Sequence, residues 1–209
     1  MSHEHSHGEH HWHPETEAVS AGRPPHVPGA PVNYPIGAST TFHAGVSGHG
    51  YIREGTVSTE ALETTLGKLE GGSAVVFSSG IATVSAILDL LPAQAVVVVA
   101  NHAYPGTVGR VRELASVGRI VLREVQVDDT AAVVSACAGA HLAWLETPSN
   151  PLMEIADLRA GIAAIHASGG LAVVDNTFMS PARQLPLSLG ADFSMHSATK
   201  YISGHSDTL

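Results

Sequence analysis

The chain has 209 residues, of which 44% are hydrophobic, and a formal net charge of −9 at pH 7. This length and apolar share allow one large α/β domain or two small ones with a sizeable core. Only ten residues are Lys or Arg, which argues against nucleic acid as a partner. The longest apolar run, at 95–100, is far shorter than the roughly 20 residues of a membrane helix, and the N-terminus has no apolar signal core. We therefore expect a cytoplasmic protein that does not bind membranes.

Residues 1–30 mix His, Glu, Pro and Gly without apolar periodicity, which predicts a disordered arm. Neutral imidazoles in a flexible tract can bind a transition metal. However, the tract has no fixed geometry and no thiolate partner, so a solvated, tag-like tail fits better and we assign no metal site. Six histidines lie within residues 1–13: His3, His5, His7, His10, His11 and His13.

Helix-like and strand-like segments alternate from about residue 57 onward. STEALETTLGKLEGG predicts a first helix with Ser58 as its N-cap and Gly71 and Gly72 as its stop. SAVVF, at 73–77, is then predicted to be a short buried strand. A tight turn and a helix in IATVSAILDLL, ended by Pro92, follow it.

The same alternation continues to the C-terminus. Further strands are predicted at 95–100, 119–125, 141–146, 171–175 and 192–196, and helices near 107–117, 129–138 and 157–168. Because the strands are continuous apolar runs separated by helices, we expect an α/β fold with a mostly parallel sheet covered by helices on both faces.

Polar residues follow almost every predicted strand. In a parallel sheet the functional loops lie at the carboxyl ends of the strands, so these residues should gather at one edge. They are Ser78, Ser79, Gly80, Asn101, His102, Tyr104, Glu146, Ser149, Asn150, Asp175, Asn176, Ser197, Thr199 and Lys200.

Three of these positions suggest specific chemistry. Gly80 lies between a strand and a helix, where a helix N-terminus can receive a phosphate and Ser79 adds a hydroxyl, although Gly is also common there for steric reasons. Asp175 ends an apolar strand, either as a turn cap or as the partner of a cation. Lys200, one of two lysines with Lys68, is an ordinary solvated side chain or, in a water-poor cleft, a nucleophile or base.

One cofactor, pyridoxal 5′-phosphate (PLP), accounts for all three positions. Its aldehyde takes a lysine, its pyridinium nitrogen takes a carboxylate, and its phosphate takes hydroxyls and a helix N-terminus. Moreover, the stretches ETPSNPLMEIADL, VVDNTFMSPARQLPLSLGAD and HSATKYISGHSD closely resemble the cystathionine γ-synthase, γ-lyase and β-lyase family of PLP enzymes acting on sulfur amino acids. The resemblance runs from about Tyr51 to the C-terminus. It implies the large domain of the aspartate aminotransferase-like fold type I, incomplete at its C-terminus.

The resemblance also implies roles for individual residues. Lys200 would be the Schiff-base lysine and proton carrier, Asp175 the partner of the pyridine nitrogen, and Tyr104 the residue that stacks on the ring and helps to shuttle protons. Asn150 would lie near the ring hydroxyl. The residues that would hold the phosphate are Ser79, Gly80, Ile81, Ser197 and Thr199.

Tyr51 and Arg53 match a pair that, in this family, reaches the phosphate of the neighbouring subunit. The planar fork of donors on arginine suits that role. The resemblance therefore implies a homodimer, usually paired into a homotetramer. It divides the chain into the arm at 1–30, a segment at 31–56 that contacts the neighbouring subunit, and a truncated PLP-binding domain at 57–209.

The sequence departs from the family pattern in several places. GTVST stands where Asn-Pro-Thr is common, Ile81 where Met is usual, and Pro105 where Gly often follows the tyrosine. In addition, relatives continue for nearly as many residues again and carry there the arginine that grips the substrate carboxylate. We therefore expect catalysis to require a part that this chain lacks.

The predicted activity is PLP-dependent γ-elimination or γ-replacement in trans-sulfuration, of the cystathionine γ-synthase or γ-lyase type. Methionine γ-lyase or O-acetylhomoserine sulfhydrylase activity is the alternative, although no cysteine follows Tyr104 as methionine γ-lyase would suggest. Ser197 to Lys200 also spell the S-x-x-K motif of penicillin-binding enzymes, but no later K-T-G element exists. An inactive fragment or a His-rich metal-binding protein is the alternative of a different class.

Overall fold

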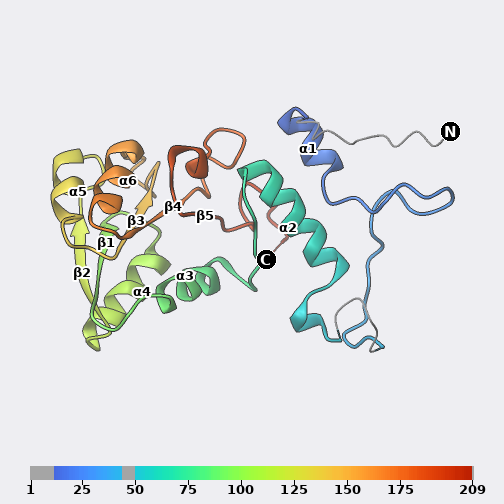
Figure 1. Ribbon diagram of the computed structural model, residues 1–209, viewed down its shortest axis with the longest axis horizontal. Coiled ribbons are helices and arrows are strands. Elements are labelled where there is room, and N and C mark those ends of the chain that lie inside the picture. Colours follow the sequence, from blue (N-terminus) through green and yellow to red (C-terminus); the bar gives the residue numbers. More distant parts are fainter. Residues whose placement is uncertain (1–11, 44–49, 209) are drawn as a thin grey trace, which may run out of the picture. The chain divides into compact units, whose positions relative to one another are not determined.

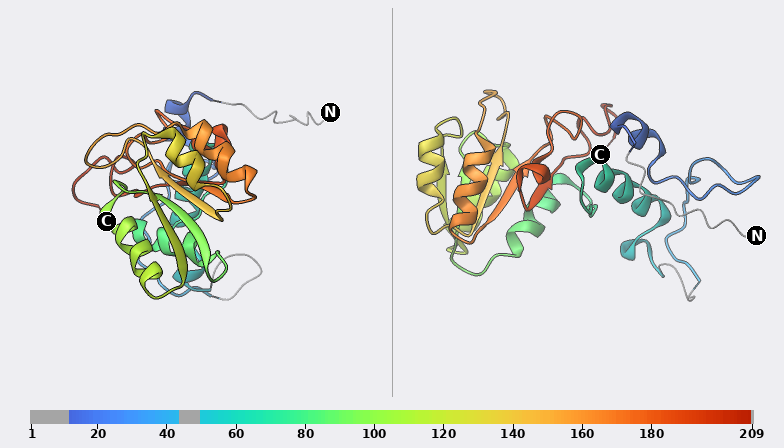
Figure 2. Two further views of the ribbon diagram at one scale, coloured as in Figure 1. Left: turned by 90° about the vertical axis from the view of Figure 1, so that its left-hand side faces the viewer. Right: turned by 45° about the horizontal axis from the view of Figure 1, so that its top comes forward.

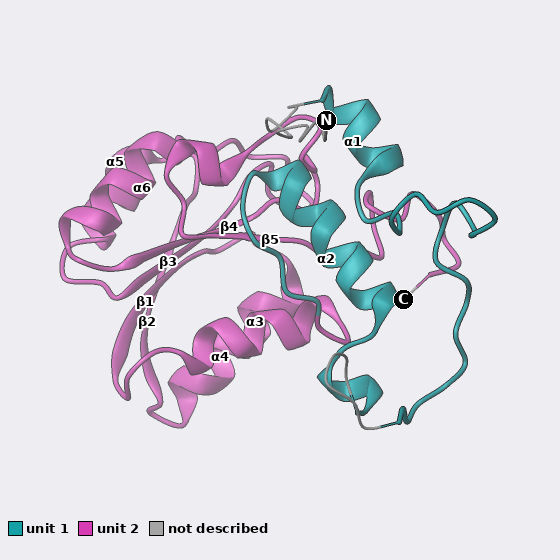
Figure 3. Ribbon diagram, turned by 45° about the vertical axis from the view of Figure 1, so that its right-hand side comes forward, with its two compact units in different colours: residues 1–76 teal, residues 77–209 magenta. Residues whose placement is uncertain are grey.

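The structure is a computed structural model that describes residues 12–43 and 50–208. It contains two compact units, Met1–Val76 and Phe77–Leu209, which Figure 3 shows in different colours. The second unit holds the whole sheet, and the described residues of the first unit form two helices and a short 3-10 turn. Within the described ranges, no helix has the length and apolar character needed to cross a membrane.

A five-stranded sheet with the order β2-β1-β3-β4-β5 forms the centre of the second unit. Every neighbouring pair of strands in it is parallel, as the alternation of apolar segments predicts. The strands are β1 (Ala95–Ala100), β2 (Ile120–Val125), β3 (Leu142–Glu146), β4 (Leu171–Asp175) and β5 (Phe193–Met195).

Helices cover both faces of this sheet, which confirms the predicted fold class (Figure 1). The helices α5 and α6 lie on one face, and α3 and α4 lie on the other, as the turned views also show (Figures 2 and 3). Their bounds are α3 (Gly80–Asp89), α4 (Pro105–Ser116), α5 (Thr130–Ala136) and α6 (Leu158–Ala167), with a 3-10 turn η2 (Pro186–Leu189) before β5.

The core of the second unit is centred on β3. Leu142, Trp144 and Leu145 have no exposed side-chain surface, and Ile165 of α6 is equally buried. The central strands read as continuous apolar runs because each of their faces is covered by a helical layer. This packing holds the carboxyl ends of the strands in fixed positions.

The first unit contains α1 (Pro14–Ser20), the 3-10 turn η1 (Ile52–Glu54) and α2 (Val57–Glu70). Thr56, rather than the predicted Ser58, is the N-cap of α2, because its hydroxyl accepts a hydrogen bond from the backbone N–H of Thr59 at 3.2 Å. The Thr65 hydroxyl of α2 donates to the carbonyl of Ala21 at 2.9 Å, which fixes the end of α1 on α2.

Part of the expected arm is helical. Pro14 occupies the first turn of α1, where a missing N–H costs little, and Glu15 and Glu17 place negative charge at the positive helix end. Contact with α2 then adds the tertiary stabilisation that a helix this short needs and that its own composition does not provide. His13 is the N-cap of α1, while the other five histidines of residues 1–13 lie outside the described residues.

The predicted strand at 73–77 is absent, although these residues are described. The backbone N–H of Val76 donates to the Glu63 carboxylate at 2.8 Å instead of to a neighbouring strand, and Val75 is 72% exposed. The prediction was wrong because an apolar run becomes a strand only beside another strand that completes its hydrogen-bond ladder.

The central packing makes a testable prediction about stability. Ile165→Ala should lower the free energy of unfolding by about 2–5 kcal/mol, because it leaves a cavity between α6 and the sheet. Val117→Ala is the matched control: this side chain is 73% exposed, so its truncation should cost no more than about 0.5 kcal/mol. Urea denaturation of both variants measures the difference, and equal losses would contradict the assignment of Ile165 to the core.

Candidate functional site

The carboxyl ends of three neighbouring strands lie side by side. Glu146 at the end of β3 pairs in register with Asp175 at the end of β4, which in turn pairs with Met195 at the end of β5. The polar segments that follow these strands therefore start from one edge of the sheet. This is the gathering that the sequence predicts, and it is where ligands bind in open parallel sheets.

Thr177 joins Asp175 to Ser197. Its backbone N–H donates to Asp175 Oδ1 at 3.0 Å. Its hydroxyl oxygen accepts the backbone N–H of Ser197 at 2.9 Å. The carboxylate at the end of β4 and the segment after β5 are thus fixed relative to each other through one residue.

Gly80 brings the N-terminus of α3 against Ser197. A Cβ atom built on Gly80 would lie 3.2 Å from both Ser197 Cβ and Met195 Cε, which is tighter than an ordinary contact. Ser79 caps the helix by accepting the backbone N–H of Ala82 at 3.2 Å, so its own O–H is left to donate. The positive helix end and two hydroxyls next to each other form a donor set suited to a phosphate.

Lys200 and Thr199 belong to the turn that follows β5. The backbone N–H of Lys200 donates to the carbonyl of Ser197 at 3.0 Å, so the lysine is tied directly to the segment that meets Gly80. Thr199 is half-buried and Lys200 is exposed. The described residues therefore do not supply the water-poor surroundings that the sequence suggested for this amine.

Tyr104 is held at both its backbone and its ring. Its N–H donates to Glu146 Oε2 at 2.6 Å, which ties the start of α4 to the end of β3. Its ring lies over Gly106, where a Cβ atom would come within 2.4 Å of Tyr104 Cε1. The phenol side chain itself is 48% exposed and available to a ligand.

Glu146 and Asp175 are two buried carboxyl groups on adjacent strands. Burial raises the pKa of both, and the negative charge of Asp175 raises the pKa of Glu146 further, to about 8. Thr177 and the nearby His196 favour the anionic form of Asp175, but burial outweighs them and its pKa stays above the usual value. With a pKa of about 8, the Glu146 carboxyl group is mainly protonated near neutral pH.

The loop after β3 comes back to the loop after β1. The backbone N–H of Asn150 donates to the carbonyl of His102 at 3.2 Å, two residues before Tyr104. The structure thus links Asn150 to the segment that carries Tyr104. Ile81, by contrast, is an exposed apolar residue in the first turn of α3, so it can offer a phosphate its backbone N–H alone.

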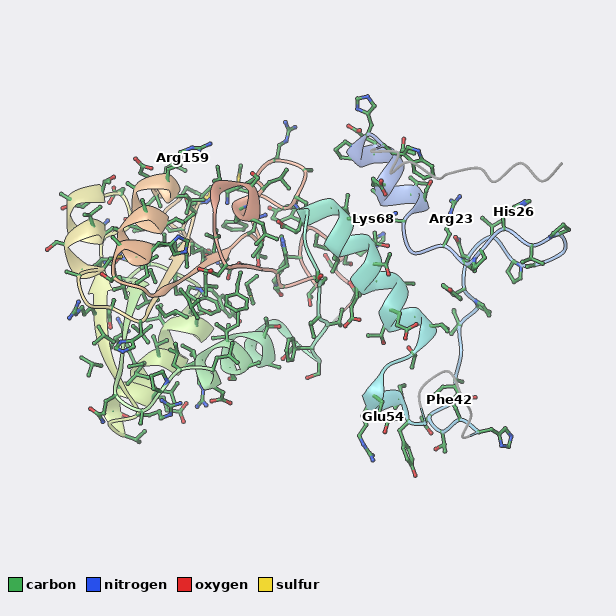
Figure 4. The ribbon with its side chains drawn as sticks, in the orientation of Figure 1. Arg23, His26, Phe42, Glu54, Lys68 and Arg159 are labelled. Atoms are coloured by element: carbon green, nitrogen blue, oxygen red, sulfur yellow. The ribbon has the colours of Figure 1, made fainter. Side chains whose placement is uncertain are left out.

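Tyr51 and Arg53 lie in the first unit. The Arg53 guanidinium lies 4.5 Å from the centre of the Tyr51 ring, a cation–π contact. Glu54, labelled in Figure 4, accepts the backbone N–H groups of Gly50 and Tyr51 at 2.8 and 3.2 Å. The turn therefore presents an exposed aromatic ring and a cation as one ordered pair.

Sequence reasoning missed three residues that organise the site. Thr177 was overlooked because a threonine two residues after a strand-ending Asp is a common turn element, although this spacing could have drawn attention to it. Gly106 carries no functional group, and Glu154 acts through contacts distant in sequence.

Among residues 12–43 and 50–208, no group of three or more His, Cys, Asp or Glu side chains could hold a metal ion.

Residues 15–209 match the family of Cys/Met metabolism PLP-dependent enzymes. The chain belongs to this family. It is 42% identical over 205 residues to a cystathionine γ-synthase of Mycobacterium tuberculosis, which covers 94% of the chain and 53% of that protein. It is also 40% identical over 184 residues to the cystathionine β-lyase MetC of Bacillus subtilis, covering 85% of the chain and 47% of the relative.

Solved structures of this family share the fold. The crystal structure of cystathionine γ-synthase from Xanthomonas oryzae pv. oryzae in complex with cystathionine has a TM-score of 0.89 at 38% identity. The similarity covers 96% of the chain and 54% of that structure. The chain spans about half the length of the relatives it matches.

The raised pKa of Glu146 predicts how stability depends on pH. Between the ordinary value of 4.5 and about 8, the folded protein holds a proton that the unfolded chain has released. The contribution of Glu146 to the free energy of unfolding is therefore complete below the lower value and is lost as pH rises through the upper one, by up to ~1.4 kcal/mol per pH unit.

Glu146→Gln removes this titration and keeps an acceptor for the Tyr104 N–H. Urea denaturation of the PLP-free protein at pH 5, 6, 7 and 8 should show a flatter pH dependence for the variant than for the wild type. Parallel curves would mean that Glu146 does not titrate in this window.

Proposed function

We propose that the chain forms the PLP-binding part of an enzyme that carries out γ-replacement or γ-elimination on sulfur amino acids, of the cystathionine γ-synthase or γ-lyase type. The observation that carries the proposal is the unbroken series of contacts from Gly80 to Ser197, then to Thr177 and Asp175. These contacts connect the donors suited to a phosphate with a buried carboxylate at the same edge of the sheet.

The donor set fits PLP in its chemistry. Asp175 would face the ring nitrogen: a cation beside this carboxylate would offset the burial that raises its pKa. The backbone N–H groups of Gly80 and Ile81 and the hydroxyls of the nearby serines and threonine would receive the phosphate. These hydroxyls belong to Ser79, Ser197 and Thr199.

When bound, PLP supplies an electron sink for carbanion chemistry at the α carbon of an amino acid. Lys200 would hold the cofactor, and its Nζ atom would accept the α proton, since it is the lysine on the segment that meets Gly80. Tyr104 would offer its exposed ring as a stacking surface and its hydroxyl as a second proton donor or acceptor. Asn150 would contact the ring hydroxyl.

The assembly belongs to the same proposal. The exposed pair of Arg53 and Tyr51 would reach the phosphate bound by a second copy of the chain, in a homodimer or a homotetramer. Arginine suits this role because its planar fork of donors matches phosphate oxygens, and stacking on the tyrosine ring orients the fork in advance. We place the enzyme in the cytoplasm, with the amino-acid metabolism in which its family takes part.

Two lysines allow a sharp test of the cofactor site. Lys200→Ala should abolish the yellow absorbance of lysine-bound PLP and lower turnover in the intact protein by about 10²- to 10⁴-fold. Lys68→Ala is the matched control, because Lys68 projects from α2 in the first unit with its Nζ 3.8 Å from Glu17 Oε2 (Figure 4). Absorbance that survives in Lys200→Ala would exclude Lys200 as the cofactor lysine.

Product analysis distinguishes between the possible reactions. The intact protein is supplied with O-acylhomoserine and cysteine in one assay and with cystathionine alone in another. Cystathionine formed in the first assay indicates a γ-synthase, whereas ketobutyrate and cysteine released in the second indicate a γ-lyase. Methanethiol released from methionine, or homocysteine formed from O-acetylhomoserine and sulfide, would identify the alternatives, and no product in any assay would refute the proposal.

A further inference from the structure

Glu154 is the centre of a hydrogen-bond network beside the candidate site. Its side chain is only 11% exposed, and its two carboxylate oxygens lie 3.0 and 3.1 Å from His102 Nδ1. The Ser149 hydroxyl donates to Oε2 at 3.0 Å, and the Gln126 amide donates to Oε1. Three side chains therefore converge on one carboxylate.

The network defines the charge state of its members. Burial raises the pKa of Glu154, but the hydrogen bonds from His102 and Ser149 outweigh it and leave the pKa below its usual value. An ionised carboxylate accepts hydrogen bonds and donates none, so the proton of His102 must sit on Nδ1. Because each of these side chains donates to the ionised Glu154 carboxylate, the hydrogen bonds are of the stronger, charge-assisted kind.

The three donors come from segments that are distant in sequence. His102 follows β1, Gln126 follows β2 and Ser149 follows β3. The network therefore ties together the carboxyl ends of three neighbouring strands. Gln126 extends it further by accepting the side-chain amide of Asn101 at 3.1 Å. This arrangement differs from an ordinary surface ion pair, which joins two mobile side chains and contributes little.

The tied segments carry two of the candidate cofactor contacts. Tyr104 lies two residues after His102, and Asn150 follows Ser149 directly. The backbone adds two bonds to the same junction: Ser149 N–H donates to the Glu154 carbonyl at 3.0 Å, and Asn150 N–H donates to the His102 carbonyl at 3.2 Å. A shift of the Glu154 side chain would therefore move both segments.

We propose that Glu154 is a positioning residue that fixes the loop bearing Tyr104 against the loop bearing Asn150. Its own carboxylate is fully engaged by donors and takes no part in the chemistry. The effect on PLP rests on the proposed function, whereas the coupling of the two loops does not.

The chain offers a matched control. His166 Nε2 and Asp192 Oδ2 form another histidine–carboxylate pair, at 2.9 Å. Asp192 directly precedes β5, and its Oδ2 also accepts the backbone N–H of Ala172 at 2.7 Å. This pair lies at the amino ends of β4 and β5, away from the candidate site, so Asp192→Asn reports what losing such a carboxylate does to the fold in general.

The test compares Glu154→Gln, His102→Ala and Asp192→Asn with the wild-type protein in its intact form. Glu154→Gln replaces one of the two acceptor oxygens with an NH₂ group. The hydrogen bonds to that oxygen are lost, while the side-chain volume is kept. PLP should bind about tenfold more weakly. At saturating PLP its visible circular dichroism should also change, and amide hydrogen exchange in 101–104 and 147–154 should be faster. His102→Ala should shift all three in the same direction, and Asp192→Asn should shift none.

Each outcome bears on the inference. A purely structural defect would weaken the fold but leave the circular dichroism of saturated PLP as in the wild type, and that result would overturn the positioning role. Unchanged exchange in both loops would overturn the coupling itself. If the wild type bound no PLP, the proposed function would fail, and the exchange measurement alone would still decide whether Glu154 couples the loops.

Discussion

The candidate site depends on the parallel register between β3, β4 and β5. This register places Glu146, Asp175 and Met195 at one level, so that the segments after them begin side by side. A slip of one residue in any of these ladders would turn the strand-ending side chains to the opposite face. The buried apolar residues of β3 and β4 prevent such a slip, because it would also exchange every side chain that packs against the helices.

The same register forces two carboxyl groups close together, and a local donor contacts each of them. The backbone N–H of Thr177 donates to Asp175, and the backbone N–H of Tyr104 donates to Glu146. Burial raises the pKa of both carboxyl groups, and the hydrogen bond from Thr177 opposes that rise at Asp175. In this way one edge of the sheet combines a carboxyl group that holds the tyrosine loop with a second, buried carboxyl group whose anionic form a cationic ligand would stabilise.

Most of the fold could be predicted from the sequence because apolar runs and helix boundaries are local signals. The five paired strands and the four helices of the second unit follow from them. The segment at 73–77 could not be predicted in this way, since an apolar run does not reveal whether a partner strand lies beside it. Thr177 and Glu154 were missed for a related reason: their importance lies in contacts across 20 and 52 positions, with Ser197 and His102, which no local pattern records.

The contact between Tyr104 and Gly106 has a consequence for how this protein tolerates sequence change. The ring occupies the space that any side chain at position 106 would need, so even alanine would displace it. A survey of all single substitutions would therefore rank position 106 with residues that bear reactive groups, although glycine has none. Position 106 would be intolerant because only glycine, which has no side chain, leaves room for the Tyr104 ring.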